Sequence, residues 1–158
     1  RYPAAKELVK GSIADDEMYY TNSIHLRADA PVDLITRIRL QSKFHPLIES
    51  GAIIHAFVGE ERPSPASVLA LVRKTFDKTR AAQLTISPEF THCEGCQRLM
   101  PRILEQCEYC GSKDVYGITR IVGYYSRINN WNKSKLGELK DRRRGLYTVA
   151  PETSAATV

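Results

Sequence analysis

Residues 93–111 read CEGCQRLMPRILEQCEYCG, and this stretch holds all four cysteines of the chain within eighteen positions. Two Cys-x-x-Cys pairs are separated by ten residues. Each pair predicts a tight turn that directs two thiolates toward one point, and two such turns supply the tetrahedral sulfur shell that zinc or iron accepts. We therefore expect a metal-binding knot over residues 91–112, with Cys93, Cys96, Cys107 and Cys110 as its ligands.

Two other uses of the cysteines are less compatible with the sequence. Paired disulfides are rare in the cytosol, and a redox Cys-x-x-Cys needs only one pair in a thioredoxin-like setting. Because four sulfur ligands would fill the metal shell, no position remains for water, and the metal is expected to be structural zinc, or iron. His92 could replace a cysteine, although a place outside the shell is more usual for such a residue.

Upstream of the cysteines the chain predicts alternating strands and helices. Residues 18–26 and 82–87 favour strands by their apolar and β-branched content, and the apolar run 52–58 favours a strand buried on both faces. Residues 65–80 predict a helix, because Ser64-Pro65 is a cap followed by a first-turn proline. A further helix is expected from a cap at Asp29 to near Pro46. This order favours an α/β fold with a parallel or mixed sheet.

Composition sets limits but names no function. A chain of 158 residues with 42% hydrophobic content suffices for one core, and the net charge of +5 lies entirely in residues 113–158, which hold 9 basic against 4 acidic residues. This excess indicates a solvated helix face or a surface for phosphates or an acidic partner. No apolar run reaches the roughly 18 residues of a membrane span, and the start, Arg1-Tyr2-Pro3, lacks the charged and apolar regions of a signal peptide, so we expect a cytoplasmic protein. The first residue, Arg1, suggests a fragment of something longer.

A glycine lies in an apolar, strand-like segment directly after the cysteines: residues 118–128 read ITRIVGYYSRI. A radical on a backbone Cα is delocalised between the amide nitrogen and the carbonyl, which requires a planar centre, and glycine flattens there without moving a side chain. Ile121, Val122 and Tyr124 would shield such a centre at Gly123 from water. The ordinary alternative is a bulge, a turn or a close backbone approach.

Several motifs together resemble the anaerobic (class III) ribonucleotide reductases of the glycyl radical enzyme family. RIVGY (120–124) followed by WNKSK (131–135) resembles the family's glycyl radical motif, which also follows a Cys-x-x-Cys zinc site. The resemblance extends over residues 2–146 and includes YYTNS (19–23), KFHPL (43–47) and GAIIH (51–55). Ser50, Glu108 and Ser134 depart from the family pattern, and these departures concern only local loops.

The resemblance implies a fold and a division of the chain. Residues 1–90 would be the C-terminal part of a ten-stranded catalytic α/β barrel and 91–112 the zinc knot. Residues 113–146 would form the radical loop with a C-terminal helix, and 147–158 a flexible tail.

The resemblance also implies a chemistry. An activating enzyme with S-adenosylmethionine and a 4Fe–4S cluster would take a hydrogen atom from Gly123, and Gly123 would pass the radical to a cysteine that attacks the ribonucleotide. Because the four cysteines here are expected to bind metal, that cysteine would lie on an N-terminal remainder of the reductase, in the same gene or a separate chain. The whole enzyme is expected to be a homodimer, and the electron donor stays open.

Other polar and aromatic residues are weaker candidates for substrate or loop contacts. His25 and His45 are more simply explained as hydrogen-bonded core residues. The candidate contacts are Thr21, Asn22, Ser23, His55, Tyr124, Trp131 and Asn132. Two rival functions remain: a zinc-ribbon module that binds nucleic acid, and a stand-alone subunit that replaces a damaged radical segment.

Overall fold

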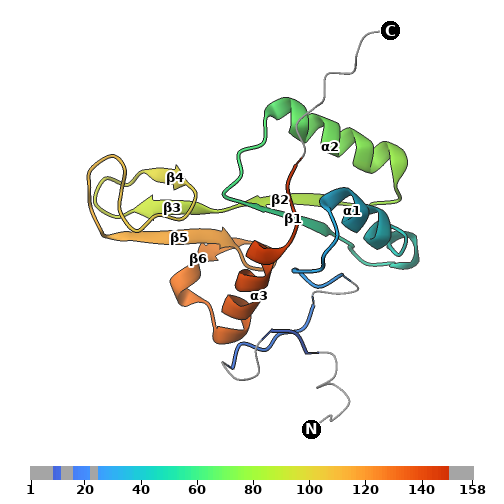
Figure 1. Ribbon diagram of the computed structural model, residues 1–158, viewed down its shortest axis with the longest axis horizontal. Helices are drawn as coiled ribbons and strands as arrows, with labels where there is room; N and C mark the ends of the chain where they lie inside the picture. The colour runs from blue at the N-terminus through green and yellow to red at the C-terminus, as the bar shows by residue number, and fades with distance from the viewer. Residues whose placement is uncertain (1–8, 12–15, 22–24, 150–158) are drawn as a thin grey trace.

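The computed structural model describes residues 9–11, 16–21 and 25–149, and it contains two separate sheets (Figure 1). The first sheet is a parallel pair of β1 (Ile54–Gly59) and β2 (Leu84–Pro88), in which Ile54 lies opposite Leu84. Helix α2 (Pro65–Lys78) connects these strands, as a parallel crossover requires. The expected α/β class is therefore confirmed.

The core lies on one face of this parallel pair. Ile54, Ala56 and Val58 alternate along β1 and are buried against α1 (Leu34–Ser42), α2 and the segment after residue 145. The opposite face carries His55 and Phe57, which are only partly buried. The prediction of a strand buried on both faces is thus met on one face only.

The helix starts show where local capping rules suffice. The side chain of Ser64 accepts a hydrogen bond from the backbone of Ser67, so α2 begins at Pro65 as predicted. Helix α1 is capped by Asp33 and not by Asp29, which corrects the expected start. Asp29 lies five residues before Leu34, too far to cap this helix, and its two carboxylate oxygens accept hydrogen bonds from Arg27 at 2.9 and 2.7 Å. A short 3-10 turn, η2 (His45–Leu47), follows α1.

The second sheet is an antiparallel ribbon with the strand order β4-β3-β5-β6. Its strands are β3 (Phe90–Cys93), β4 (Leu99–Pro101), β5 (Val115–Arg120) and β6 (Tyr125–Arg127). The ribbon extends to one side of the parallel pair, and η3 (Ile128–Asn130) leads from it into α3 (Lys133–Arg144) (Figure 1). The turns that carry the cysteine knot and the loop that carries Gly123 therefore connect strands of one continuous sheet.

Both ends of the described chain differ from expectation. Within the described part of residues 18–26 there is no strand, and Tyr19 forms only an isolated bridge with Lys10. Tyr147 and Val149 are buried in the main core, so the expected flexible tail does not begin at 147. Their apolar surface fills space beside β1, which holds the backbone in place. Among the described helices, none is both long and apolar enough to cross a membrane.

Candidate functional site

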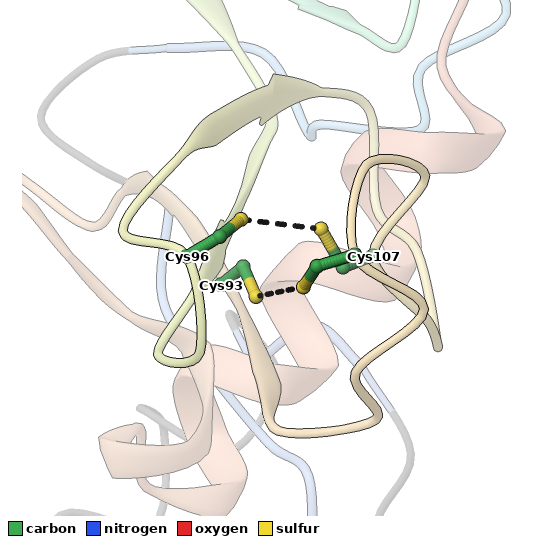
Figure 2. A group of neighbouring side chains, drawn as sticks. Cys93, Cys96 and Cys107 are labelled. Atoms are coloured by element: carbon green, nitrogen blue, oxygen red, sulfur yellow. Dashed lines mark hydrogen bonds between the residues drawn. The ribbon is translucent and has the colours of Figure 1, made fainter.

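The four cysteines converge from two turns of the ribbon. Cys93 and Cys96 lie at the end of β3 and in the turn after it, and Cys107 and Cys110 lie in the turn before β5. The Sγ atoms of Cys96 and Cys107 are 3.6 Å apart, as are those of Cys93 and Cys110, and Figure 2 shows the side chains directed toward one another. All four sulfurs lie within 4.8 Å of one another.

This arrangement fits a tetrahedral metal ion. Zn–S bonds of about 2.3 Å place tetrahedral sulfurs roughly 3.8 Å apart, close to the spacing observed here. The sulfurs also have backbone partners, since the N–H of Tyr109 donates to Sγ of Cys107 at 3.4 Å. His92 stays outside the sulfur group and packs its ring on Tyr116 at 5.0 Å. The donor set is therefore four thiolates, compatible with zinc.

The backbone around Cys107 favours its charged form. Desolvation raises the pKa of this thiol, but the N–H groups of Cys110 and Tyr109 that point at the sulfur outweigh it and lower the pKa to about 6. The thiolate is the form that binds metal, so the turn prepares at least one ligand for an ion at neutral pH.

Gly123 lies at the tip of the hairpin formed by β5 and β6. The tip closes through a hydrogen bond from the N–H of Ile121 to the carbonyl of Tyr124 at 2.9 Å. Gly123 is exposed, and Val122 and Tyr124 are 50% and 65% exposed. The expected shielding by Ile121, Val122 and Tyr124 is thus absent in this chain, because Val122 and Tyr124 themselves lie at the surface and Ile121 is only partly buried.

The fold gives no reason of its own for glycine at this tip. A Cβ added at Gly123 would have no atom within 4 Å, and the residue does not adopt a left-handed φ. In contrast, a Cβ at Gly137 would collide with the carbonyl oxygen of Glu17, and one at Gly145 with that of Ala28. Glycine at 137 and 145 is required by packing, whereas glycine at 123 is not.

Residues after the hairpin hold its base. Trp131 is buried, and its Nε1 donates to Oγ of Ser126 on β6 at 2.8 Å. Asn132 caps α3, because its side chain accepts from the N–H of Lys135 at 2.9 Å. These two candidates therefore have structural contacts, and Tyr124 lies apart from them on the exposed tip.

Three histidines lie close to the parallel pair, and His55 and His25 meet on the face of β1 that is turned away from the main core. The ring of His55 stacks on Phe57 at 5.4 Å and meets the edge of His25 at 5.9 Å. Burial, with a smaller effect of the nearby His25, lowers the pKa of His55 to about 4. His55 and Thr21 line one small cavity of about 30 Å³, while Asn22 and Ser23 lie outside the described residues. His45 is buried, and its Nδ1 accepts from the N–H of Ala82 at 2.9 Å.

Sequence reasoning missed one buried ion pair near the hairpin. Arg142 and Glu138 on α3 are each 4% exposed, and their side chains meet at 2.5 Å. The run of arginines at 142–144 predicted a solvated surface, so the burial of Arg142 was not expected. The spacing of four residues between Glu138 and Arg142 was the available signal.

Comparison with known proteins places these features in context. The chain matches the family model of the anaerobic ribonucleoside-triphosphate reductase over residues 3–144. It is similar to the crystal structure of the anaerobic ribonucleotide reductase from Thermotoga maritima with MES in the active site, with 26% identity and a TM-score of 0.53. That match covers 64% of this chain and 16% of the other.

A second structure of the Thermotoga maritima reductase, in complex with dATP and CTP, is 23% identical, with a TM-score of 0.49, over 71% of this chain and 16% of that one. No curated protein sequence matches the chain. The chain thus spans about 16% of the length of the solved structures that it resembles.

Proposed function

The chain belongs to the anaerobic ribonucleoside-triphosphate reductase family, a family of oxidoreductases, and from this premise we propose that it stores the enzyme's radical on Gly123. One observation carries the proposal. Gly123 occupies a hairpin tip where neither φ nor packing requires glycine, so the reason for glycine is sought in its chemistry. A Cα radical needs a planar centre delocalised over the adjoining amide groups, and glycine alone reaches it without displacing a side chain.

The exposed tip supports a role in a larger assembly. Val122, Tyr124 and Tyr125 present apolar surface around Gly123, and such surface commonly marks an interaction site. We propose that residues before the cysteines complete one side of a ten-stranded α/β barrel whose other strands belong to the rest of the reductase. The hairpin would enter that barrel, where the radical is protected from water and oxygen.

The cysteine knot would bind structural zinc and stabilise the hairpin. Cys93 pairs with Val115 in the ladder between β3 and β5, and β5 continues directly to the hairpin tip. A metal ion on the four thiolates fixes both turns that flank this ladder. Its contribution in this proposal is to hold β5 in place, and it takes no part in the radical chemistry.

The proposed reaction then follows from hydrogen-atom transfer. A partner enzyme with S-adenosylmethionine and a 4Fe–4S cluster removes one hydrogen atom from Gly123. The Gly123 radical takes a hydrogen atom from a cysteine thiol, which restores glycine and leaves a thiyl radical. The thiyl takes the 3′-hydrogen of a ribonucleotide, and the 2′-hydroxyl then leaves as water. Over the whole reaction an external donor supplies two electrons, and two protons are taken up, so that the 2′ C–OH becomes C–H. The thiol finally returns its hydrogen atom to carbon 3′, which restores the thiyl radical. The cysteine must come from the rest of the reductase, because the four cysteines of this chain form the sulfur cluster.

The proposal assigns partners and a location. The chain would work with the remainder of a homodimeric reductase, with the activating enzyme and with a ribonucleotide substrate, in the cytoplasm. His55 and Thr21, which lie beside one another, are the candidate residues of this region for contact with a substrate or the radical loop.

The test compares two glycines with the same local freedom. Gly51 is also exposed, has no left-handed φ and leaves a Cβ without neighbours. In the complete reductase, activated anaerobically, Gly123→Ala should abolish both the organic radical and product formation. Gly51→Ala should retain the radical. A radical of wild-type intensity in Gly123→Ala would refute the proposal.

A further inference from the structure

Arg142 lies at the junction of the hairpin, α3 and β1. It is 4% exposed, although it belongs to a run of three arginines on the final helix. Burial of an arginine is costly unless its charge and its N–H groups find partners. The partners of Arg142 therefore indicate what this position is built to hold.

Two of its N–H groups hold the hairpin directly. Nη1 donates to the carbonyl oxygen of Arg120 at 2.6 Å, and Nη2 donates to that of Ile121 at 2.9 Å. These carbonyls end the β5 side of the hairpin, and Gly123 follows Ile121 by two residues. The guanidinium thus fixes the backbone from which the tip extends.

The remaining contacts fix the guanidinium itself. Nε and Nη2 both donate to Oε1 of Glu138, at 3.1 and 2.5 Å, so the charge is neutralised within α3. The guanidinium also lies over the ring of Phe57 on β1, 4.1 Å from its centre, and near Trp131 at 5.7 Å. A flat cation between the rings and the backbone carbonyls connects three elements that are distant in sequence.

We propose that Arg142 is a positioning residue that sets the place of Gly123 relative to β1. This inference rests on the proposed function, because position matters only if Gly123 exchanges a hydrogen atom with a group elsewhere in the enzyme. The planar fork of arginine serves two carbonyls and one carboxylate through three separate nitrogens, whereas the N–H groups of a lysine ammonium diverge from one nitrogen and do not match this arrangement. Arg142 contacts no substrate in this scheme and acts through the hairpin backbone.

The experiment uses the complete activated reductase and two matched substitutions. Arg142→Lys keeps the charge opposite Glu138 but loses the fork. Arg144→Lys is the control, since its side chain is 72% exposed and makes a single ion pair with Asp141 at 3.5 Å. The measurements are metal content, radical per chain by electron paramagnetic resonance, turnover per radical, and KM for the ribonucleotide.

In Arg142→Lys we expect normal metal content, a radical yield within about twofold of wild type, and an unchanged KM. Turnover per radical should fall at least about tenfold, because small displacements of reacting groups cost rate steeply. Arg144→Lys should match wild type in every measurement. This pattern separates positioning from a general role in folding.

Two results would overturn the inference while the proposed function stands. One is unchanged turnover per radical in Arg142→Lys. The other is a parallel loss of metal, radical and turnover, which would show that Arg142 only maintains the fold. Absence of a radical on Gly123 in the wild-type enzyme would instead refute the proposed function, and this inference with it.

Discussion

His55 illustrates how a single residue responds to its place in the fold. Its ring lies between Phe57 and His25, and burial lowers its pKa to about 4, with a further effect of the neighbouring His25 and Arg120. An unfolded histidine titrates near pH 6.5. The unfolded chain therefore takes up this proton first as the pH falls, and folding stability depends on pH between these two values.

The stabilising effect of a neutral His55 should be complete above about pH 6.5 and disappear as the pH falls toward 4. Over this pH range the free energy of unfolding should change by at most about 3 kcal/mol through His55. Urea unfolding of the chain at several pH values measures it. His55→Phe keeps a flat ring without a titrating group and should reduce the dependence of the free energy of unfolding on pH over this range. An unchanged slope would show that His55 does not contribute.

The hydrogen bond between Trp131 and Ser126 is a second residue-scale feature that can be measured. Ser126→Ala removes the acceptor of the buried indole N–H and should destabilise the chain by about 1 kcal/mol. Trp131→Phe should lower the free energy of unfolding less in the Ser126→Ala variant than in the wild-type chain, because that variant has already lost the hydrogen bond. Additive free energies of unfolding in this double-mutant cycle would rule out coupling between the two side chains.

At the scale of elements, the ribbon and the parallel pair have separate cores. One core packs β1 against α1 and α2. The second core consists of Met100 together with two cysteines of the knot, Cys93 and Cys107. The second core is small, so its stability should depend on the bound metal. The two sheets should therefore respond differently to metal removal.

Removal of the metal should loosen the ribbon more than the parallel pair. In hydrogen-exchange measurements, a chelator should speed amide exchange in β3 and β5 and leave β1 and β2 almost unchanged. Added zinc should restore protection in the wild-type chain but not in Cys93→Ser. Equal loss of protection in both sheets would contradict this separation.

The elements also show how far the sequence predicts the fold. The cysteine knot and the start of α2 follow from spacing and capping rules that act locally. The parallel pairing is one of the two outcomes, parallel or mixed, that the order of strands and helices predicts. The predicted start of α1 was wrong because Asp29 and Asp33 are equal candidates by residue type, whereas the helix begins at Leu34, directly after Asp33. The burial of Arg142 depends on Phe57 and on two backbone carbonyls far away in sequence, which no local pattern reveals.

At the scale of the whole molecule, most cations of the basic C-terminal third lie beside a carboxylate in the fold. Lys135 and Arg142 both form ion pairs with Glu138. Arg143 pairs with Glu89, and Lys140 pairs with Glu17. Lys133 lies 3.6 Å from Asp16, and Arg144 lies 3.5 Å from Asp141. Each of these six cations has a carboxylate beside it, which lowers its attraction for phosphates and weakens the alternative of a nucleic-acid-binding ribbon.

Binding to DNA or RNA should accordingly be weak. We expect a dissociation constant no tighter than the roughly 10⁻⁴–10⁻⁶ M of non-specific binding at physiological salt, with a shallow dependence on salt. Titration of labelled oligonucleotides at two salt concentrations tests this. A tight complex whose affinity falls by about 10³ or more between 50 and 200 mM salt would instead support the binding module.

The central claim, that the Cα of Gly123 holds an unpaired electron, is tested most directly by isotope labelling. A glycine radical retains one Cα hydrogen, so its electron paramagnetic resonance signal should be a doublet. In the activated complete reductase made with Cα-deuterated glycine, this doublet should collapse to a narrow line. A signal that is identical with and without deuterium would place the electron elsewhere and contradict the account.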